Sequence, residues 1–401
     1  MLQTAETLPL LTDSARAVLK MIVNSGPVTR PQLSSALAFS KPTMSAAVGE
    51  LEAQGLVASH GVSKGALGRS AVTYGLGPRS GFVIGLDCGT TQINAVASGL
   101  DGQRIFETET SLDDRSTNSD RSRFAMVRQA VEVVIAQCQN LGPLRAITIA
   151  LPNIVSRSME RLGEKESLLE MLADLYRAYA VPILLENNVN CAALAEYHEG
   201  AAKDHSFAIY LQIGVKIGLG IVVDGKLFRG FRGGAGEISH MAFPWSQTER
   251  PVFQGLETYL GSVELIERCR SGWPMRDGAP PETAAELFAR AETSQFARAC
   301  IDRHADDVGR LVATCVSVLD PQLVVLGGGV GQNTILIKGV EKVVEELCWP
   351  VEIAVSHLPR KATVLGAVRL AIDFAVGGLL GEDSGAVFVY DAGWSENGIR
   401  T

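Results

Sequence analysis

The sequence of 401 residues has neither paired cysteines nor long apolar runs. Its seven cysteines are scattered and none belongs to a CxxC pair, which excludes a disulfide framework and fits a reducing cytoplasm. The longest apolar runs, such as Leu323–Leu326 and Ala146–Leu151, are far shorter than the ~20 residues that cross a bilayer. The first twenty residues contain Glu6 and Asp13 and lack the basic start and apolar block of a secretory leader. We therefore expect a cytoplasmic protein.

Phosphate-binding loops of standard spacing are also missing. The chain contains neither GxxxxGKS nor GxxxxGKT. A GxGxxG pattern fails because Gln332 follows Gly327 and Gly329 where a third glycine is needed. Glycines in such turns more often serve backbone geometry than phosphate binding. Spacing alone therefore predicts no nucleotide site.

Composition and charge divide the chain unevenly. It is 46% hydrophobic and 20% charged, which is enough to fill the cores of the two or three domains that its length predicts. The net charge is −8, but residues 1–79 carry +3 and the remainder carries −11. A basic module on an acidic body is the pattern expected when only the module meets phosphate. Sampling noise is the alternative, because +3 is a modest excess.

Helix signals alternate with short breaks over the first fifty residues. Asp13 can cap a helix that ends at Ser25–Pro27, and Thr29 can cap a second one. After a break at Ala38–Phe39, Ser40 can cap a third helix. This is the order of a helix-turn-helix, whose last helix enters the major groove of DNA with its N-terminal residues.

A β-hairpin wing is expected next, from the glycine-rich stretch 61–68 and the alternating segment Arg69–Tyr74. Together these features predict a winged helix-turn-helix DNA-binding domain over residues 1–79. The third helix is expected to turn its polar start outward to base edges, and the basic residues around it are expected to meet mostly phosphate. The alternative is a small helical cap that contacts nothing. The predicted DNA-binding residues are Ser40, Lys41, Thr43, Met44 and Ser45 on the third helix, and Arg30, Lys64 and Arg69 around it.

From Gly81 onward, β-like segments alternate with helical stretches, which predicts α/β layers. Two openings of the same strand–strand–turn kind occur, at 82–109 and at 206–228. They predict a duplicated fold with a cleft between two lobes.

Several short motifs occur in this body in a fixed order. They are Asp87-Cys88-Gly89-Thr90-Thr91, Leu185-Glu186-Asn187-Asn188-Val189-Asn190, Gly236-Glu237-Ile238-Ser239-His240-Met241, Leu256-Glu257-Thr258, Leu319-Asp320-Pro321 through Gly327-Gly328-Gly329, and Leu365-Gly366-Ala367. With them, roughly residues 11–376 resemble the ROK family, which joins repressors and sugar kinases. The resemblance implies an α/β fold: an N-terminal winged helix-turn-helix, then an actin/hexokinase-like, two-lobed ATPase-type domain over residues 80–376. The tail 377–401 has no expected role.

The departures from the family pattern indicate an inactive kinase. Asn188 stands where the family's kinases keep the aspartate that takes the proton from the sugar, and a missing general base costs on the order of 10²–10⁴ in rate. The second phosphate motif, usually GTGIG, reads Gly214-Val215-Lys216-Ile217-Gly218. The first motif keeps Asp87, Gly89 and Thr91 as a remnant. We expect no catalytic residue and no ATP.

The family's zinc site is missing from the sequence as well. It needs a histidine and three cysteines in CxCGxxGC, because zinc takes about four N or S ligands. Here the stretch is Pro251-Val252-Phe253-Gln254-Gly255, and His240 has no cysteine partner nearby in the sequence. We expect no metal.

A set of polar residues remains on the positions that contact the hexose in the family. Carboxylates and amides supply the paired donors and acceptors that hydroxyls require. The interpretation is a cytoplasmic, sugar-responsive transcriptional regulator, a repressor, that binds palindromic operator DNA as a homodimer or a dimer of dimers. The alternatives are an active sugar kinase with a DNA-binding arm and a DNA-binding protein with a relic cleft. The expected sugar-binding residues are Asn187, Asn188, Glu237, His240 and Glu257.

Overall fold

The structure is a computed structural model, and it describes residues 10–64, 70–89, 92–112, 120–152, 155, 165–244, 246, 248–382, 385 and 388–392. The chain divides into two units, Met1–Asn188 with Ala367–Thr401, and Val189–Gly366. The chain crosses between them twice, after Asn188 and after Gly366. The division expected after residue 79 stays a prediction.

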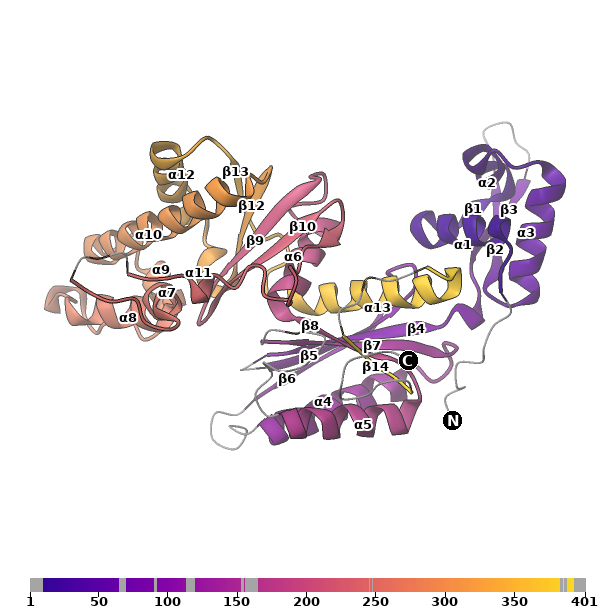
Figure 1. Cartoon of the computed structure of the whole chain (residues 1–401), viewed down its shortest axis with the longest axis horizontal. Helices are drawn as coiled ribbons and strands as arrows, with labels where there is room; N and C mark the ends of the chain where they lie inside the picture. Colours follow the sequence, from indigo (N-terminus) through magenta and orange to yellow (C-terminus); the bar gives the residue numbers. More distant parts are fainter. Residues whose placement is uncertain are drawn as a thin grey trace. The chain divides into compact units, whose positions relative to one another are not determined.

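The N-terminal part of the first unit is a winged helix (Figure 1). Its elements are α1 (Asp13–Ser25), β1 (Val28–Thr29), α2 (Arg30–Leu37), α3 (Lys41–Ala53), β2 (Val57–Lys64) and β3 (Ser70–Leu76). The three strands form a sheet in the order β1-β3-β2, and β2 and β3 pair as the predicted hairpin.

Side-chain caps set the starts of the three helices. The Thr29 and Ser40 hydroxyls accept hydrogen bonds from the backbone of the first turns of α2 and α3, as predicted. The prediction for α1 was wrong by one residue, because Thr12 and not Asp13 caps it by accepting from the Ala15 N–H. Ala38, at φ 53°, provides the left-handed turn between α2 and α3.

The rest of the first unit is a six-stranded sheet in the order β14-β8-β7-β4-β5-β6. Its elements are η1 (Pro78–Ser80), β4 (Phe82–Cys88), β5 (Gln92–Gly99), β6 (Arg104–Ser111), α4 (Asp120–Gln137), β7 (Leu144–Leu151), α5 (Lys165–Tyr179), β8 (Ile183–Asn187), α13 (Ala362–Leu380, which begins in the second unit) and β14 (Phe388–Tyr390). Helices α4 and α5 cover one face and α13 lies along the other (Figure 1). Alternation along β4 explains this, because Ile84 and Leu86 pack toward α4 and α5 while Gly85 faces α13.

The second unit contains a five-stranded sheet in the order β11-β10-β9-β12-β13. Its elements are α6 (Asn188–Glu199), β9 (Phe207–Ile213), β10 (Ile217–Val223), β11 (Lys226–Leu227), η2 (Ile238–His240), α7 (Gly255–Leu260), α8 (Ser262–Ser271), η3 (Met275–Asp277), α9 (Ala284–Ala289), α10 (Gln295–Leu319), β12 (Leu323–Gly327), α11 (Gly328–Gly331), η4 (Thr334–Leu336), α12 (Ile337–Leu347) and β13 (Glu352–Val355). In both units, three antiparallel strands are followed by two parallel ones, β6-β5-β4-β7-β8 and β11-β10-β9-β12-β13. This repeat confirms the predicted duplication.

Helix α13 is apolar and long enough to cross a membrane, with a mean hydropathy of 1.7 over its best window. In this structure it packs inside the protein. The Val368 backbone approaches β4 so closely that a Cβ on Gly85 would lie 2.4 Å from its nitrogen. Helix α13 runs past residue 376, where the second domain was expected to end, and continues to Leu380. It ends at Gly381 (φ 68°).

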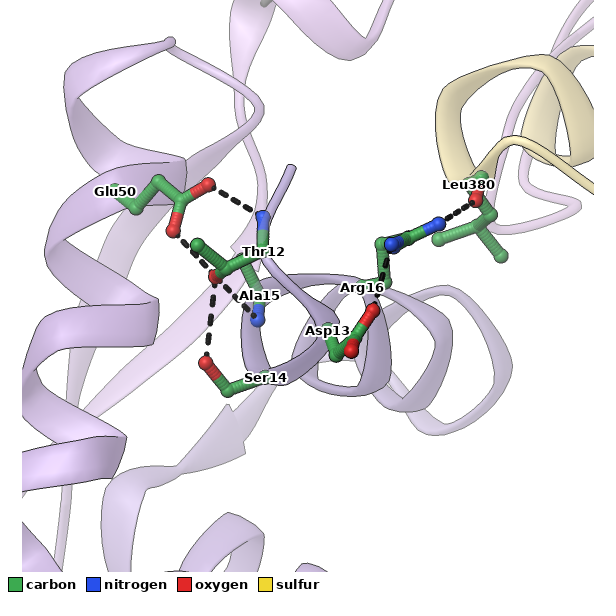
Figure 2. Close-up of polar contacts among 7 residues, drawn as sticks. All are labelled: Thr12, Asp13, Ser14, Ala15, Arg16, Glu50 and Leu380. Atoms are coloured by element: carbon green, nitrogen blue, oxygen red, sulfur yellow. Dashed lines mark hydrogen bonds and ion pairs between the residues drawn. The ribbon is translucent and has the colours of Figure 1, made fainter. Parts of the chain in front are cut away.

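The end of α13 is part of the winged-helix core. Leu380 is buried in the hydrophobic cluster of α1 and α3, and Val376 and Leu379 pack against that cluster. Arg16 of α1 donates a hydrogen bond to the Leu380 carbonyl oxygen (Figure 2). Part of the tail that had no expected role thus packs in the core of the winged helix. Another part forms β14, which pairs with β8.

Candidate DNA-binding and ligand-binding sites

The N-terminus of α3 presents a small polar surface. Lys41, Thr43 and Ser45 are exposed there. The Ser40 hydroxyl caps the helix by accepting from the Thr43 N–H at 3.3 Å, and it lies 2.8 Å from the Thr43 hydroxyl. These four residues occupy the place that a winged helix turns toward base edges.

Met44 was expected to face outward on the same surface, and this prediction was wrong. Its side chain is 1% exposed and belongs to the winged-helix core. The reason is helical spacing, because Met44, Val48 and Leu51 lie at i, i+4 and i+7 and share one face. Met44 therefore stabilises the domain and does not contact a base from this position.

Of the three basic residues expected to contact phosphate, the structure describes the side chain of Arg30 alone. The Arg30 guanidinium lies 3.4 Å from the Glu52 carboxylate and 4.8 Å from the centre of the Tyr74 ring. Arg30 is therefore engaged within the domain. The side chain of Lys64 and all of Arg69 lie outside the described residues.

Sequence analysis missed the contact that holds α3 on α1. The Glu50 carboxylate of α3 accepts from the Thr12 backbone N–H at 2.9 Å and from the Thr12 hydroxyl at 2.6 Å (Figure 2). Since Thr12 also caps α1, one residue fixes the start of α1 and the position of α3. A separation of 38 residues hid this pair from local pattern analysis.

The first unit places its predicted sugar and phosphate residues along one edge of its sheet. Strands β4, β7 and β8 are parallel, and Asp87, Ala150 and Glu186 are in register across them. Asn187 ends β8 and Asn188 begins α6, so both follow the carboxyl end of a strand, where ligands bind in open α/β sheets. The Asn187 N–H donates to the Glu186 carboxylate at 2.8 Å.

The remnant of the first phosphate motif, Asp87 with Gly89, lies at the same edge of the sheet. Burial raises the pKa of Asp87 to about 6, an effect that the neighbouring Asn94 amide partly offsets. A Cβ on Gly89 would lie 2.8 Å from the Gln92 carbonyl oxygen, so this turn requires glycine for its own backbone. Thr91 lies outside the described residues.

The second unit brings together its three predicted sugar residues. Glu237 and His240 lie on the η2 turn, which contacts helix α7, and Glu257 belongs to α7. The Glu257 carboxylate accepts from the Ile217 N–H at 3.4 Å. The His240 ring stacks on Phe253, with ring centres 5.0 Å apart. The cluster is polar, partly exposed and backed by an aromatic ring, which suits a sugar.

The loop of the second phosphate motif is a tight turn held by α8. The Gly214 N–H donates to the Lys216 carbonyl oxygen at 3.0 Å, and the Ser262 N–H donates to the Gly214 carbonyl oxygen at 2.8 Å. Lys216 is exposed. The loop therefore places the Ile217 N–H beside the Glu257 carboxylate.

The residues at the family's zinc position do not fit a zinc ion. Phe253 stands beside His240 where the metal would need thiolates. Within the described part of the chain, no group of three or more His, Cys, Asp or Glu side chains could hold a metal ion.

A winged helix joined to a duplicated two-sheet α/β domain defines the class of protein. The sequence pattern of the ROK family matches residues 83–374, and that of the MarR family matches residues 11–65. The chain belongs to the ROK family and carries an N-terminal MarR-type winged helix.

Curated relatives of the chain include regulators. The xylose repressor of Caldicellulosiruptor bescii is 25% identical over 390 residues, which cover 88% of this chain and 94% of the relative. The xylose repressor of Bacillus subtilis is 26% identical over 58% of this chain and 60% of its own length. The DNA-binding transcriptional dual regulator NagC of Escherichia coli is 21% identical over 82% and 83% of the two chains.

Solved structures agree on the fold. A ROK family transcriptional regulator, a homologue of the E. coli MLC protein, superposes with a TM-score of 0.71 at 22% identity, over 91% of this chain and 96% of that one. A ROK hexokinase from Thermus thermophilus has a TM-score of 0.58 at 26% identity, over 72% and 97%. The hexokinase match covers a smaller share of this chain.

Proposed function

We propose that this chain is a cytoplasmic, sugar-responsive transcriptional repressor whose winged helix binds a palindromic operator as a dimer. The observation that carries the proposal is the exposed and capped N-terminus of α3 in a ROK-family chain. It is supported by Asn188, which stands where the family resemblance implies an aspartate. The first offers a surface to DNA. The second keeps hydrogen bonding to a sugar and removes the general base. The relatives named as xylose repressors and NagC support the same function.

On the DNA side, Lys41, Thr43 and Ser45 face base edges. A dimer presents two α3 helices to half-sites about one helical turn apart, so the operator is a palindrome. The charge of +3 on residues 1–79 supplies attraction to phosphate that the acidic remainder lacks.

On the ligand side, the carboxylates of Glu237 and Glu257, the imidazole of His240 and the amides of Asn187 and Asn188 pair with sugar hydroxyls. Relatives named xylose repressor and N-acetylglucosamine repressor point to a pentose such as xylose or to an N-acetylated hexosamine. Neither ATP nor a metal ion takes part.

The chain itself connects the ligand side to the DNA side. It crosses between the two units directly after Asn188 and again within α13, and α13 ends in the winged-helix core at Leu380. A sugar that binds one state of the chain better than the other favours that state. Helix α13 carries that preference to the winged helix, and the sugar shifts operator binding only by its differential affinity for the two states.

The first experiment captures genomic DNA fragments with the purified chain at fixed, near-physiological salt, with and without a panel of sugars. We expect a few defined sites, released by one sugar. Glu257→Gln is the matched variant, and we expect it to keep the sites and lose the release. Diffuse, salt-sensitive capture that no sugar affects would contradict the proposal.

A second experiment separates the repressor from its rivals. The wild-type chain and Asn188→Asp are assayed for ATP-dependent phosphorylation of the same sugars, and we expect no turnover by the wild type. Measurable wild-type turnover would favour a sugar kinase with a DNA-binding arm. A thermal-shift screen without any sugar response would favour a relic cleft, since a ligand at 100 times its Kd adds ~2.7 kcal/mol.

A further inference from the structure

Phe253 is an exposed aromatic residue beside the predicted sugar residues of the second unit. Its side chain is 79% exposed, and that of the neighbouring Val252 is 62% exposed. The Phe253 ring stacks on the His240 ring, with ring centres 5.0 Å apart and ring planes inclined by 29°. His240 therefore covers one face of the Phe253 ring, and the high exposure leaves the other face open.

The backbone around Phe253 is fixed by hydrogen bonds to Phe243. The Val252 N–H donates to the Phe243 carbonyl oxygen at 3.2 Å, and the Gly255 N–H donates to the Val252 carbonyl oxygen at 3.1 Å. A Cβ on Gly255 would lie 2.9 Å from the same Phe243 oxygen, so this close approach requires glycine. The segment that carries the exposed ring is thus held against Phe243.

Phe243 in turn connects this segment to helix α7. The centre of the Phe243 ring lies 5.0 Å from that of Tyr259, and both rings pack against the hydrophobic cluster of the second unit. The Tyr259 hydroxyl donates to the Asp307 carboxylate of α10 at 2.8 Å. Since Tyr259 and Glu257 belong to the same helix, one packed framework positions both Phe253 and Glu257.

The chemistry of Phe253 differs from that of the polar cluster next to it, which is Glu237, His240 and Glu257. Carboxylates and an imidazole offer donors and acceptors to the hydroxyls of a sugar. A phenyl ring offers neither. It offers a flat apolar face, on which a second ring stacks. Phe253 therefore suits a part of the ligand that the polar cluster does not serve.

We propose that Phe253 forms a subsite for a second ring of the effector, so that the ligand is a sugar that carries two rings. One ring pairs its hydroxyls with the polar cluster, and the second lies on the open face of Phe253. The second ring is a further sugar or an aryl group, because both present an apolar face. The inference rests on the proposed function, since it names the class of ligand that the same site takes.

Exposure alone does not carry this assignment, because single exposed apolar side chains are common on protein surfaces. Met275 of η3, for example, is 98% exposed. The distinguishing feature of Phe253 is its ring contact with His240, a predicted sugar residue, on a segment whose backbone is fixed. Met275 is therefore the matched control for the loss of an exposed apolar side chain.

The experiment titrates the full chain with one-ring and two-ring ligands by isothermal titration calorimetry. One series is xylose, xylobiose and phenyl β-D-xyloside. The other is N-acetylglucosamine, diacetylchitobiose and phenyl N-acetyl-β-D-glucosaminide. In the series that binds, we expect a two-ring ligand to bind roughly three- to tenfold more tightly than the single sugar, the gain of one stacked pair of rings. A gain for the disaccharide identifies the second ring as a sugar, and a gain for the phenyl glycoside alone identifies it as an aryl group.

Substitutions of Phe253 assign this gain to its ring. We expect Phe253→Ala and Phe253→Leu to remove the gain and to leave the affinity for the single sugar unchanged, because neither side chain has a flat ring. Phe253→Tyr keeps the ring and should keep the gain, as should the control Met275→Ala. Unfolding in urea should be the same in all four variants and the wild type, since both side chains are exposed.

Two results would overturn the subsite and leave the proposed function intact. The first is equal affinity of the wild type for one-ring and two-ring ligands. The second is a gain that Phe253→Ala retains. Binding of no sugar in either series would instead overturn the proposed function together with this inference, so the two failures are distinguishable.

Discussion

Arg16 of α1 donates a hydrogen bond from Nη1 to the carbonyl oxygen of Leu380, at 3.2 Å and across 364 positions of sequence (Figure 2). Leu380 is the last residue of α13, where helix carbonyls lack intrahelical partners. Nη2 of the same guanidinium pairs with Asp13 at 2.6 Å. A side chain of the first helix of the winged helix therefore donates a hydrogen bond to a carbonyl group at the end of α13.

Replacement of the Leu380 side chain by that of alanine tests whether this junction stabilises the protein. Its side chain is 2% exposed within the winged-helix core. We expect Leu380→Ala to lower the free energy of unfolding by about 2–5 kcal/mol, because it removes buried methyl groups and leaves a cavity. Urea denaturation followed by circular dichroism measures the change.

The matched control is Lys20→Ala at the same junction. Lys20 and Glu382 form an ion pair at 3.0 Å, but both side chains are 54% exposed. We expect a loss of no more than about 1 kcal/mol, because water screens such pairs. Equal small losses in the two variants would mean that the end of α13 does not pack in this core in solution.

Lys41 and Met44 give a paired test of the α3 surface. Lys41 is exposed and Met44 is buried. We expect Lys41→Ala to weaken operator binding about tenfold, the loss of one specific contact, with unchanged unfolding. For Met44→Ala we expect the reverse. Operator binding by the folded domain is unchanged, and the domain is destabilised by about 2–5 kcal/mol. Fluorescence anisotropy and urea denaturation measure both quantities.

The wing requires a different measurement, because a phosphate contact carries no sequence preference. We expect Arg69→Ala to weaken binding to operator and unrelated DNA by the same factor. The slope of log affinity against log salt concentration should fall by about 1, the release of one counterion. A variant with an unchanged slope would remove Arg69 from the phosphate contacts.

Local signals were the part of the fold that the sequence predicted best. Thr29 and Ser40 cap their helices as expected, because an N-cap is decided within three residues. The error at Met44 had a local remedy, since its spacing from Val48 and Leu51 already marks the buried stripe. Its polar neighbours Thr43 and Ser45 concealed that pattern.

Contacts between distant segments were not predictable in the same way. Nothing near Thr12 indicates that its partner is Glu50, and nothing near Leu380 indicates a core shared with α1. Helix α13 continues through Gly377 and Gly378 to Leu380, whose side chain packs in the winged-helix core. For the site, the sequence motifs supplied the candidate residues, and only strand register placed Asp87 in line with Glu186.

Asp87 predicts a pH dependence of stability. Burial raises its pKa to about 6, above the 3.8 of an unburied aspartate. A carboxyl whose pKa is raised by folding contributes stability below its unfolded pKa and loses it as pH rises through the folded value. We therefore expect Asp87→Asn to be more stable than the wild type at pH 7, by no more than about 3 kcal/mol. Denaturation at pH 7 and at pH 3.5 measures the gain, which we expect to vanish at the lower pH. A gain that is equal at both values would assign the effect to packing.

His304 predicts the opposite dependence. Its imidazole is 1% exposed in α10, and neither ring nitrogen has a hydrogen-bond partner among the described residues. Burial, reinforced by the charge of Arg268, lowers its pKa to about 4 from 6.5. A base whose pKa is lowered by folding contributes stability above its unfolded pKa, and this stability is lost as pH falls from 6.5 toward 4. We expect this group to cost the wild type up to about 3 kcal/mol over that window, and His304→Leu to escape the loss.

As pH falls from about 6 to 4, the two groups change the free energy of unfolding in opposite directions. Protonation of Asp87 in the folded protein raises it, whereas protonation of His304 in the unfolded chain lowers it. The stability of the wild type alone therefore understates both effects. The informative quantity is the difference in unfolding free energy between His304→Leu and the wild type, measured from pH 8 to pH 4. We expect this difference to be constant above pH 7 and to rise in favour of the variant below pH 6.5. A difference that stays constant to pH 4 would mean that His304 gains a proton in the folded protein as readily as in the unfolded chain.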